Sequence, residues 1–266
     1  MGHIAGLDIG SVATKAVVCR DEPSMPVAGS AVVPTGWRPL DAAHDALARA
    51  CAAAGIEPPA ITALGATGYG RDLPPEATAR ATEVFCQARA IHHLLPEART
   101  IVDIGGQDSK VIKLDADGLP LDFALNDRCA AGTGRFLEVM AAALGLTVDE
   151  LGRLAAEAPE PCPISSTCTV FAESEVVALL SRGEDRGCIA AGLCHAIARQ
   201  IIALGARVGI ERPVALVGGV AHNAGVRRAL ADQLGEPPLV PEMPQLTAAL
   251  GAAIVAADAR RNEPTS

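Results

Sequence analysis

The sequence predicts an α/β protein built from two lobes, and three observations support this prediction. A short glycine-containing motif occurs twice, near residue 8 and near residue 103. Apolar segments of strand length alternate with segments that show helical spacing along the chain. The chain has 266 residues, enough for two cores. We expect a first lobe over 1–96, a second over 97–246, and a C-terminal helix over 247–266 that packs back on the first lobe.

Composition narrows the class of protein. Half of the residues are apolar, but there are only one Trp, one Tyr and four Phe, so the cores must consist of Ala, Val, Leu and Ile. The net charge of −9 and the lack of a Lys/Arg cluster argue against binding to nucleic acid or to an acidic membrane. The sequence shows no signal peptide and no apolar run of bilayer length. We therefore expect a cytoplasmic protein, whose eight cysteines are core thiols and metal or redox ligands rather than disulfides.

The repeated motif predicts two similar β-hairpins. Each copy reads Asp-Ile-Gly, then four residues that end in Thr or Ser, then Lys and an apolar strand. The first copy runs from Asp8 to Lys15 and the second from Asp103 to Lys110, with the same internal spacing. Each hairpin places a carboxylate and a glycine-containing turn at the end of a strand. Two such lobes are expected to face each other across a cleft.

A third glycine-rich turn, Gly132-Thr133-Gly134, lies shortly after Cys129 and directly before a predicted helix. The N-terminus of a helix carries partial positive charge, which stabilises both an anionic phosphate and a thiolate. The backbone N–H groups of this turn are expected to approach a phosphate. The sequence therefore suggests that Cys129 and a nucleotide-binding turn move together.

Apolar spacing and turn residues predict the remaining elements. Short strands are expected over 61–66 and 214–217, and proline makes 158–163 a rigid linker. Ser165, Ser166 and Thr167 are suitable N-cap residues for the helix that begins at Cys168. Helices are expected over 40–54, 82–95, 136–144, 148–156, 168–181, 188–208, 223–234 and 247–260.

These motifs resemble those of a known superfamily. Asp8-Ile9-Gly10-Ser11, Asp103-Ile104-Gly105-Gly106 and Val217-Gly218-Gly219-Val220 are similar to the two phosphate loops and the adenosine loop of acetate kinases, sugar kinases, Hsp70 and actin. The resemblance implies a two-lobed actin-like/ribonuclease H-like ATPase fold, with duplicated lobes around a nucleotide cleft. Three further stretches resemble the ATP-dependent activators of 2-hydroxyacyl-CoA dehydratases and the related subunits of benzoyl-CoA reductases. They are residues 66–71, 126–138 and 164–175.

The family resemblance implies a homodimer that shares one [4Fe–4S] cluster, with Cys129 and Cys168 of each chain as ligands. It also implies that ATP hydrolysis moves the helices beside the cluster, and that a low-potential electron then passes to an iron–sulfur dehydratase or reductase. The electron donor implied is ferredoxin or flavodoxin. In the second phosphate loop and around Cys129, this sequence has the residues that resemble those of the dehydratase activators. We therefore favour that branch of the family over the benzoyl-CoA reductase subunits.

The nucleotide site is expected to hold ATP and Mg²⁺. Asp8 and Asp103 are read as Mg²⁺ residues that act through water, and Gln107 as the residue that orients the attacking water. The alternative for the two aspartates is capping of a turn. Lys15 and Lys110 either face phosphate or are solvated strand residues. The expected phosphate and adenosine contacts are Gly10, Ser11, Thr14, Lys15, Gly105, Gly106, Gly132, Thr133, Gly134, Gly218 and Gly219.

Other interpretations remain open at this point. Cys129 and Cys168 would alternatively be buried structural thiols. Cys162, which lies between two prolines, is read as incidental. The alternative functions are an activator of a benzoyl-CoA-type or double-cubane reductase, a small-molecule kinase of the same fold, and an ATP-switched assembly protein.

Overall fold

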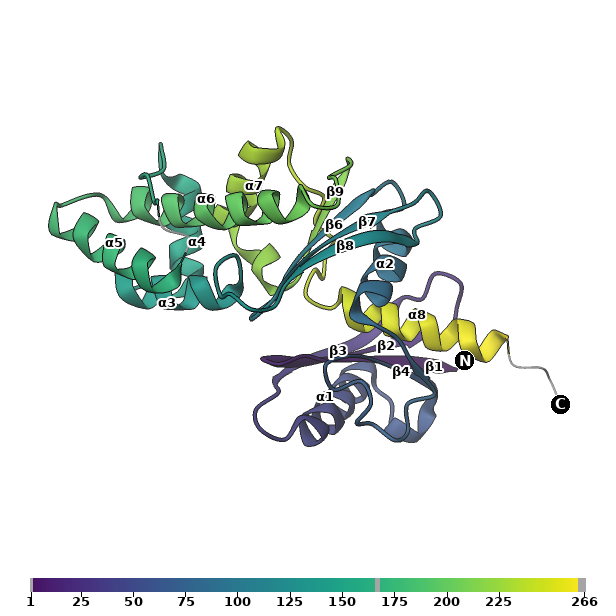
Figure 1. Ribbon diagram of the computed structural model, residues 1–266. Coiled ribbons are helices and arrows are strands. Elements are labelled where there is room, and N and C mark those ends of the chain that lie inside the picture. Colours follow the sequence, from purple (N-terminus) through teal and green to yellow (C-terminus); the bar gives the residue numbers. More distant parts are fainter. Residues whose placement is uncertain (1, 166–167, 263–266) are drawn as a thin grey trace. The chain divides into compact units, whose positions relative to one another are not determined.

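The computed structural model describes residues 2–165 and 168–262, and these form two compact units (Figure 1). Unit 1 consists of Met1–Pro96, Asp115–Pro120 and Gln245–Ser266. Unit 2 consists of Glu97–Leu114 and Leu121–Pro244. Each unit has its own sheet and is described separately.

The sheet of unit 1 has the strand order β3-β2-β1-β4-β5. Strand β1 pairs antiparallel with β2, as the first copy of the repeat predicts, and parallel with β4. Asp8 lies opposite Lys15 in the β1–β2 ladder. The strands are β1 (His3–Ile9), β2 (Ala13–Arg20), β3 (Val27–Pro34), β4 (Ile61–Gly68) and β5 (Ala79–Arg80).

Helices cover both faces of this sheet (Figure 1). Helix α1 (Pro39–Ala54) encloses an aliphatic core on one face and ends at Gly55, which has a left-handed conformation. Helix α8 (Thr247–Arg261) packs on β1 and β4, and α2 (Glu83–Leu94) packs against α8. A short 3₁₀ turn, Pro58–Ala60, precedes β4.

Two neighbouring glycines allow α8 to lie directly on the sheet. Gly6 and Gly65 are partners in the β1–β4 ladder. A Cβ atom at Gly6 would lie 2.0 Å from the carbonyl oxygen of Ala249, and one at Gly65 would lie 1.9 Å from that of Ala252. No side chain fits at these distances. The core thus gains close backbone packing in place of the large aromatic side chains that the composition lacks.

The sheet of unit 2 has the order β8-β7-β6-β9 and repeats the central pairing of unit 1. Strand β6 pairs antiparallel with β7 and parallel with β9, and Asp103 lies opposite Lys110. The strands are β6 (Thr100–Ile104), β7 (Ser109–Leu114), β8 (Pro120–Asn126) and β9 (Val214–Val217). The helices are α3 (Gly134–Leu144), α4 (Val148–Glu157), α5 (Thr169–Ser181), α6 (Arg186–Gly205) and α7 (Ala224–Leu234), with a 3₁₀ turn at Gly219–His222.

The helices expected from the sequence are all present, with ends shifted by a few residues. Helix α6 begins earlier than the expected residue 188, because Asp185 caps it by accepting from two backbone N–H groups. Cys168 is the N-cap residue of α5, while Ser166 and Thr167, two of the expected caps, lie outside the described residues. Strands β3, β5 and β8, which lie outside the central pairs of the two sheets, were not expected.

Helix α6 is the one described helix with the length and apolar composition of a membrane span, and most of that span is buried inside unit 2. Its side chains Ile189, Leu193 and Ile197 belong to the core cluster of that unit. A core helix of a globular unit has the same composition, so α6 is accounted for by its packing.

Candidate functional site

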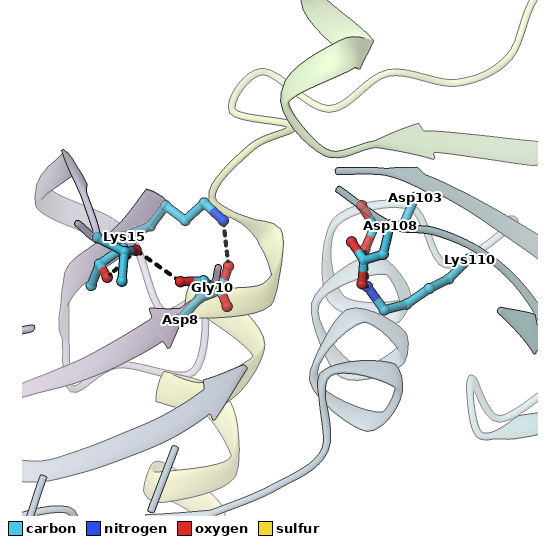
Figure 2. Close-up of polar contacts among 8 residues, drawn as sticks. Asp8, Gly10, Lys15, Asp103, Asp108 and Lys110 are labelled. Atoms are coloured by element: carbon cyan, nitrogen blue, oxygen red, sulfur yellow. Dashed lines mark hydrogen bonds and ion pairs between the residues drawn. The ribbon is translucent and has the colours of Figure 1, made fainter. Parts of the chain in front are cut away.

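The mouth of the first hairpin contains a close ion pair. The Nζ atom of Lys15 lies 2.8 Å from Oδ2 of Asp8, directly across the β1–β2 ladder (Figure 2). Asp8 is 3% exposed, and its other carboxylate oxygen, Oδ1, is buried without a hydrogen-bond partner among the described residues. A buried carboxylate oxygen of this kind requires a partner that the protein does not supply, such as a cation or its bound water.

A chain of hydroxyl groups holds the turn of this hairpin. The Thr35 hydroxyl donates to the carbonyl oxygen of Gly10 at 2.8 Å and is 2.9 Å from the hydroxyl of Thr14. Because Thr35 has one hydroxyl proton, Thr14 must be the donor in the second bond. Thr14 therefore points into the protein, and Ser11 is the exposed hydroxyl of this turn. Of these two predicted phosphate contacts, Ser11 remains accessible.

The second hairpin has an additional carboxylate. Lys110 is 5% exposed, so it is not the solvated strand residue that the sequence left open. Its Nζ lies 2.7 Å from Oδ2 of Asp108 and 3.8 Å from Oδ2 of Asp103 (Figure 2). Gln107 is exposed on the same turn. The strand-end carboxylate Asp103 is 3% exposed and shares its lysine with a carboxylate from the loop.

The turn 132–134 is bonded to the second hairpin rather than open. The N–H groups of Gly134 and Arg135 donate to the carbonyl oxygens of Gly105 and Gly106, each at 2.8 Å, and that of Thr133 donates to Ala130 at 3.0 Å. The Gly134 and Thr133 N–H groups were expected to face a phosphate, but in this conformation both are bonded to carbonyl oxygens, and those of Gly134 and Arg135 hold the β6–β7 turn against the start of α3. The predicted contact residues Gly105, Gly106 and Gly134 are thereby brought together.

A cavity of about 290 Å³ opens beside these glycines, entirely within unit 2. It is lined by Gly105, Gly106, Gly134 and Gly219, together with acidic side chains that the sequence analysis did not select. These are Glu138, on α3, and Asp149, in the first turn of α4. The position of Glu138, one helical turn after Gly134, could have indicated that it lies near the glycine turn. No sequence feature near Asp149 indicates that it lines the cavity.

Gly218 and Gly219 play different parts at the edge of this cavity. Gly218 has a φ of 86°, and a Cβ atom there would lie 2.4 Å from the carbonyl oxygen of Ile104. A Cβ atom at Gly219 would meet no atom within 4 Å. Gly218 is thus required by the backbone geometry, and Gly219 leaves the wall of the cavity open.

All eight cysteines lie in the described part of the chain, and Cys129 and Cys168 are the two that are classed as exposed. Cys168 caps the start of α5. Cys129 lies in the loop before α3, four residues ahead of the N-cap residue Thr133. The helix dipole acts within the first turn, so Cys129 lies outside its range. Asn126 closes this loop by donating to the carbonyl oxygens of Cys129 and Ala131, both at 2.9 Å. The two thiols are not buried structural residues.

The interior cysteines have a different character. Burial raises the pKa of Cys19, Cys86 and Cys194 to about 12, so these thiols are neutral at physiological pH. A neutral, enclosed thiol is a poor metal ligand. Over residues 2–165 and 168–262, no group of three or more His, Cys, Asp or Glu side chains is placed to hold a metal ion.

Duplicated hairpins, each with a carboxylate and a lysine at its mouth, and a glycine-lined cavity beside the second, define an ATPase of the actin-like α/β fold. A hexokinase of the ROK family from Thermus thermophilus has the same fold, with a TM-score of 0.53, 21% identity, and coverage of 96% of this chain and 98% of that chain. The model of the BadF/BadG/BcrA/BcrD ATPase family matches residues 5–256, and the chain belongs to this family.

Relatives of known activity span the whole chain. An activator of lactoyl-CoA dehydratase from Anaerotignum propionicum is 45% identical over 98% of this chain and 100% of its own length. The solved activator of 2-hydroxyisocaproyl-CoA dehydratase from Clostridium difficile, with bound ADPNP, has a TM-score of 0.91 at 42% identity, covering 98% of this chain and 97% of its own. Component A of the (R)-2-hydroxyglutaryl-CoA dehydratase of Acidaminococcus fermentans has a TM-score of 0.92 at 39% identity, covering 97% and 98%.

Proposed function

We propose that this protein is an ATP-hydrolysing activator that passes a low-potential electron to a 2-hydroxyacyl-CoA dehydratase. The observation that carries the proposal is full-length similarity to activators of three such dehydratases, which act on different acyl groups. The phosphate hairpins and the two exposed cysteines of this chain are the parts that such a protein needs. An iron–sulfur reductase of a benzoyl-CoA or double-cubane type is the alternative acceptor.

The proposed nucleotide contacts are the glycine-containing turn of each hairpin and, within unit 2, the cavity beside the second hairpin. Asp8 and Asp103 would hold Mg²⁺ through water, and the unpartnered Oδ1 of Asp8 fits a hydrated cation. When Mg²⁺ is bound, it neutralises the negative charge of the phosphates. Gln107 is exposed on the second turn and would orient the attacking water. Glu138 and Asp149, with acceptor oxygens only, would take hydrogen bonds from the ribose or base.

Cys129 and Cys168 are proposed as the protein ligands of a [4Fe–4S] cluster, which supplies one-electron transfer when bound. A cubane cluster needs four thiolates, and one chain exposes two, so the cluster would lie between two copies of the chain. Helix α5, which Cys168 caps, also exposes Val170, Phe171 and Val177, by 67%, 68% and 53%. Contact with a second copy would bury these side chains beside the thiol.

We expect the donor to be ferredoxin or flavodoxin, the protein to lie in the cytoplasm, and neither nucleic acid nor a membrane to be a partner. The net charge of −9 supports the expectation that neither nucleic acid nor an acidic membrane is a partner.

The test is anaerobic purification, followed by iron analysis and measurement of the molecular mass. We expect a coloured dimer with about four iron atoms per dimer. Cys129→Ser should lose the iron and the electron transfer and still bind ATP. The control Cys51→Ser, at a buried position of helix α1 in unit 1, should keep the iron and the electron transfer. A metal-free wild-type monomer, or an iron-containing Cys129→Ser protein, would contradict the proposal.

A further inference from the structure

The segment that leads into Cys168 is fastened to the start of α6 at a pair of cysteines. The N–H group of Cys162 donates to the carbonyl oxygen of Cys188 at 2.8 Å. Ile164, two residues after Cys162, accepts a second hydrogen bond at its carbonyl oxygen from the Arg199 side chain of α6, at 2.7 Å. A Cβ atom at Gly192 would lie 2.2 Å from the carbonyl oxygen of Cys162, so the segment lies directly on α6.

Both cysteines of this pair are free and half-buried. Burial raises the pKa of the Cys162 thiol, and the nearby Cys188 thiol also contributes to the raised pKa. A main-chain hydrogen bond between two residues holds their Cα atoms at roughly 5–6 Å, the separation that disulfides require. The separation of the two backbones therefore permits a covalent bond between these residues, and their partial exposure leaves them within reach of small molecules.

We propose that Cys162 and Cys188 form a reversible dithiol–disulfide site whose oxidant is a low-molecular-weight disulfide. One cysteine, as the thiolate, attacks a sulfur of the small disulfide and releases the first small thiol, which takes the proton. The second cysteine then attacks the mixed disulfide, closes the protein S–S bond and releases the second small thiol. Two protein thiols are oxidised and one small disulfide is reduced to two thiols, so the exchange balances.

The surroundings make this site slow to oxidise. Burial, with the nearby charges of Glu184 and Asp185, raises the pKa of the Cys162 thiol. Burial raises the pKa of Cys188 as well, and Asp185 adds to the effect. Both thiols are thus largely protonated at neutral pH, and only the thiolate attacks a disulfide. The pair stays reduced in a reducing cell and closes under sustained oxidising conditions, as expected for a reversible site.

Closure would restrain the part of unit 2 that contains α5. The chain between the two cysteines includes Cys168 and the whole of α5, which packs against α3 within the same unit. A disulfide that closes this segment limits how far its two ends can separate. The site itself does not depend on the proposed iron–sulfur function, because it rests on the main-chain contact between Cys162 and Cys188 and on their exposure.

The experiment uses the anaerobically purified full-length protein, incubated with glutathione disulfide, then quenched with acid and treated with N-ethylmaleimide. Trypsin places Cys162 in the peptide 154–182 and Cys188 in the peptide 187–199. We expect these peptides to be joined after oxidation, with fragment ions that assign the bond to Cys162 and Cys188. Dithiothreitol should separate them.

Matched variants assign the bond independently. Cys162→Ser and Cys188→Ser should each abolish the joined peptide, whereas Cys194→Ser, in the same tryptic peptide as Cys188, should retain it. The proposal is overturned if wild-type protein shows no joined peptide, if glutathione remains attached to either cysteine without closure, or if the bond is assigned to Cys168. The wild-type fragment ions decide the matter even where a variant fails to fold.

Discussion

The two hairpins have equivalent backbones but hold their lysines differently. Asp8 and Lys15 form a pair at 2.8 Å, whereas Lys110 lies nearer to Asp108, at 2.7 Å, than to Asp103, at 3.8 Å. The turns are otherwise alike. Gly10 N–H donates to Ala13 at 3.2 Å in the first hairpin, and Gly105 N–H donates to Asp108 at 2.9 Å in the second.

The difference arises from one residue. Asp108 occupies the position that Ala13 has in the first hairpin, five residues after the strand-end aspartate. Strand pairing places the aspartate opposite the lysine in both units, but a carboxylate from the turn then competes for the lysine in unit 2. One hairpin therefore carries a balanced pair, and the other carries two carboxylates with one lysine. The repeat preserves the architecture while a single turn residue changes the local charge.

The equivalence extends to the strand beside each hairpin. Gly68 ends β4 and Gly218 follows β9, and both have a φ of 86°. A Cβ atom at Gly68 would lie 2.5 Å from the carbonyl oxygen of Ile9, and one at Gly218 would lie 2.4 Å from that of Ile104. The close approach of this glycine to the mouth of the hairpin is thus a shared structural feature of the two units.

The largest expected effect concerns the carboxylates. Asp103→Asn should reduce ATP hydrolysis by about a thousandfold (~4 kcal/mol of barrier), because an amide cannot hold the hydrated cation by charge. Asp8→Asn should act in the same direction, because Asp8 is the equivalent strand-end carboxylate of the first hairpin. Steady-state phosphate release measures both. Asp122→Asn, at an exposed position on β8, is the control. Normal turnover of the Asp103→Asn protein would remove this residue from the mechanism.

The shared glycines come next. Gly218→Ala and Gly68→Ala should each lower the free energy of unfolding by about 3 kcal/mol, because the methyl group meets a carbonyl oxygen and φ is positive. Denaturant titration measures the loss, and soluble yield measures it where the protein does not fold. Gly219→Ala, which has open space, should change stability by less than about 1 kcal/mol. Unequal losses at Gly68 and Gly218 would show that the two units are not equivalent here.

Asp108→Ala converts the second hairpin to the composition of the first. Lys110 is 5% exposed and loses its nearest carboxylate, so we expect a loss of about 2 kcal/mol, limited because Asp103 remains to pair with it. Asp117→Ala, at an exposed turn, should be neutral. Urea titration compares the two variants. An unchanged midpoint for Asp108→Ala would mean that the turn carboxylate does not contribute to the stability of the hairpin.

The smallest effect concerns the hydroxyl groups at equivalent positions of β2 and β7. Thr14 bonds to Thr35, which holds the first turn, and Ser109 bonds to the carbonyl oxygen of Gly132. Thr14→Val and Ser109→Ala should each cost about 1 kcal/mol, because a buried acceptor loses its donor. Thermal unfolding measures the change, with Ser11→Ala, at an exposed hydroxyl, as the control. If only one of the two variants loses stability, the hydroxyl group holds the turn in that unit alone.

The elements beyond the hairpins show where sequence patterns carry less information. Helix α1 was predictable because apolar spacing and a terminal glycine coincide. Strand β8 was not, since three of its seven residues are exposed and it starts at a proline. An outer strand gains its conformation from its pairing with β7 rather than from a buried apolar run. Cys162 was read as incidental because it lies between two prolines, and its main-chain bond to Cys188 joins segments that are far apart in the sequence.

The sequence by itself determined the duplicated Asp-to-Lys hairpins, the order of the helices and the cysteines that the family resemblance selects. Spacing along the chain fixes a ladder register, so these features are local. Only the tertiary structure decided that Lys110 lies nearer to Asp108 than to Asp103, that the first N–H groups of α3 hold Gly105 and Gly106, and that the cavity also includes Glu138 and Asp149. These outcomes depend on distances between segments that are far apart in the sequence, which no spacing within one segment contains.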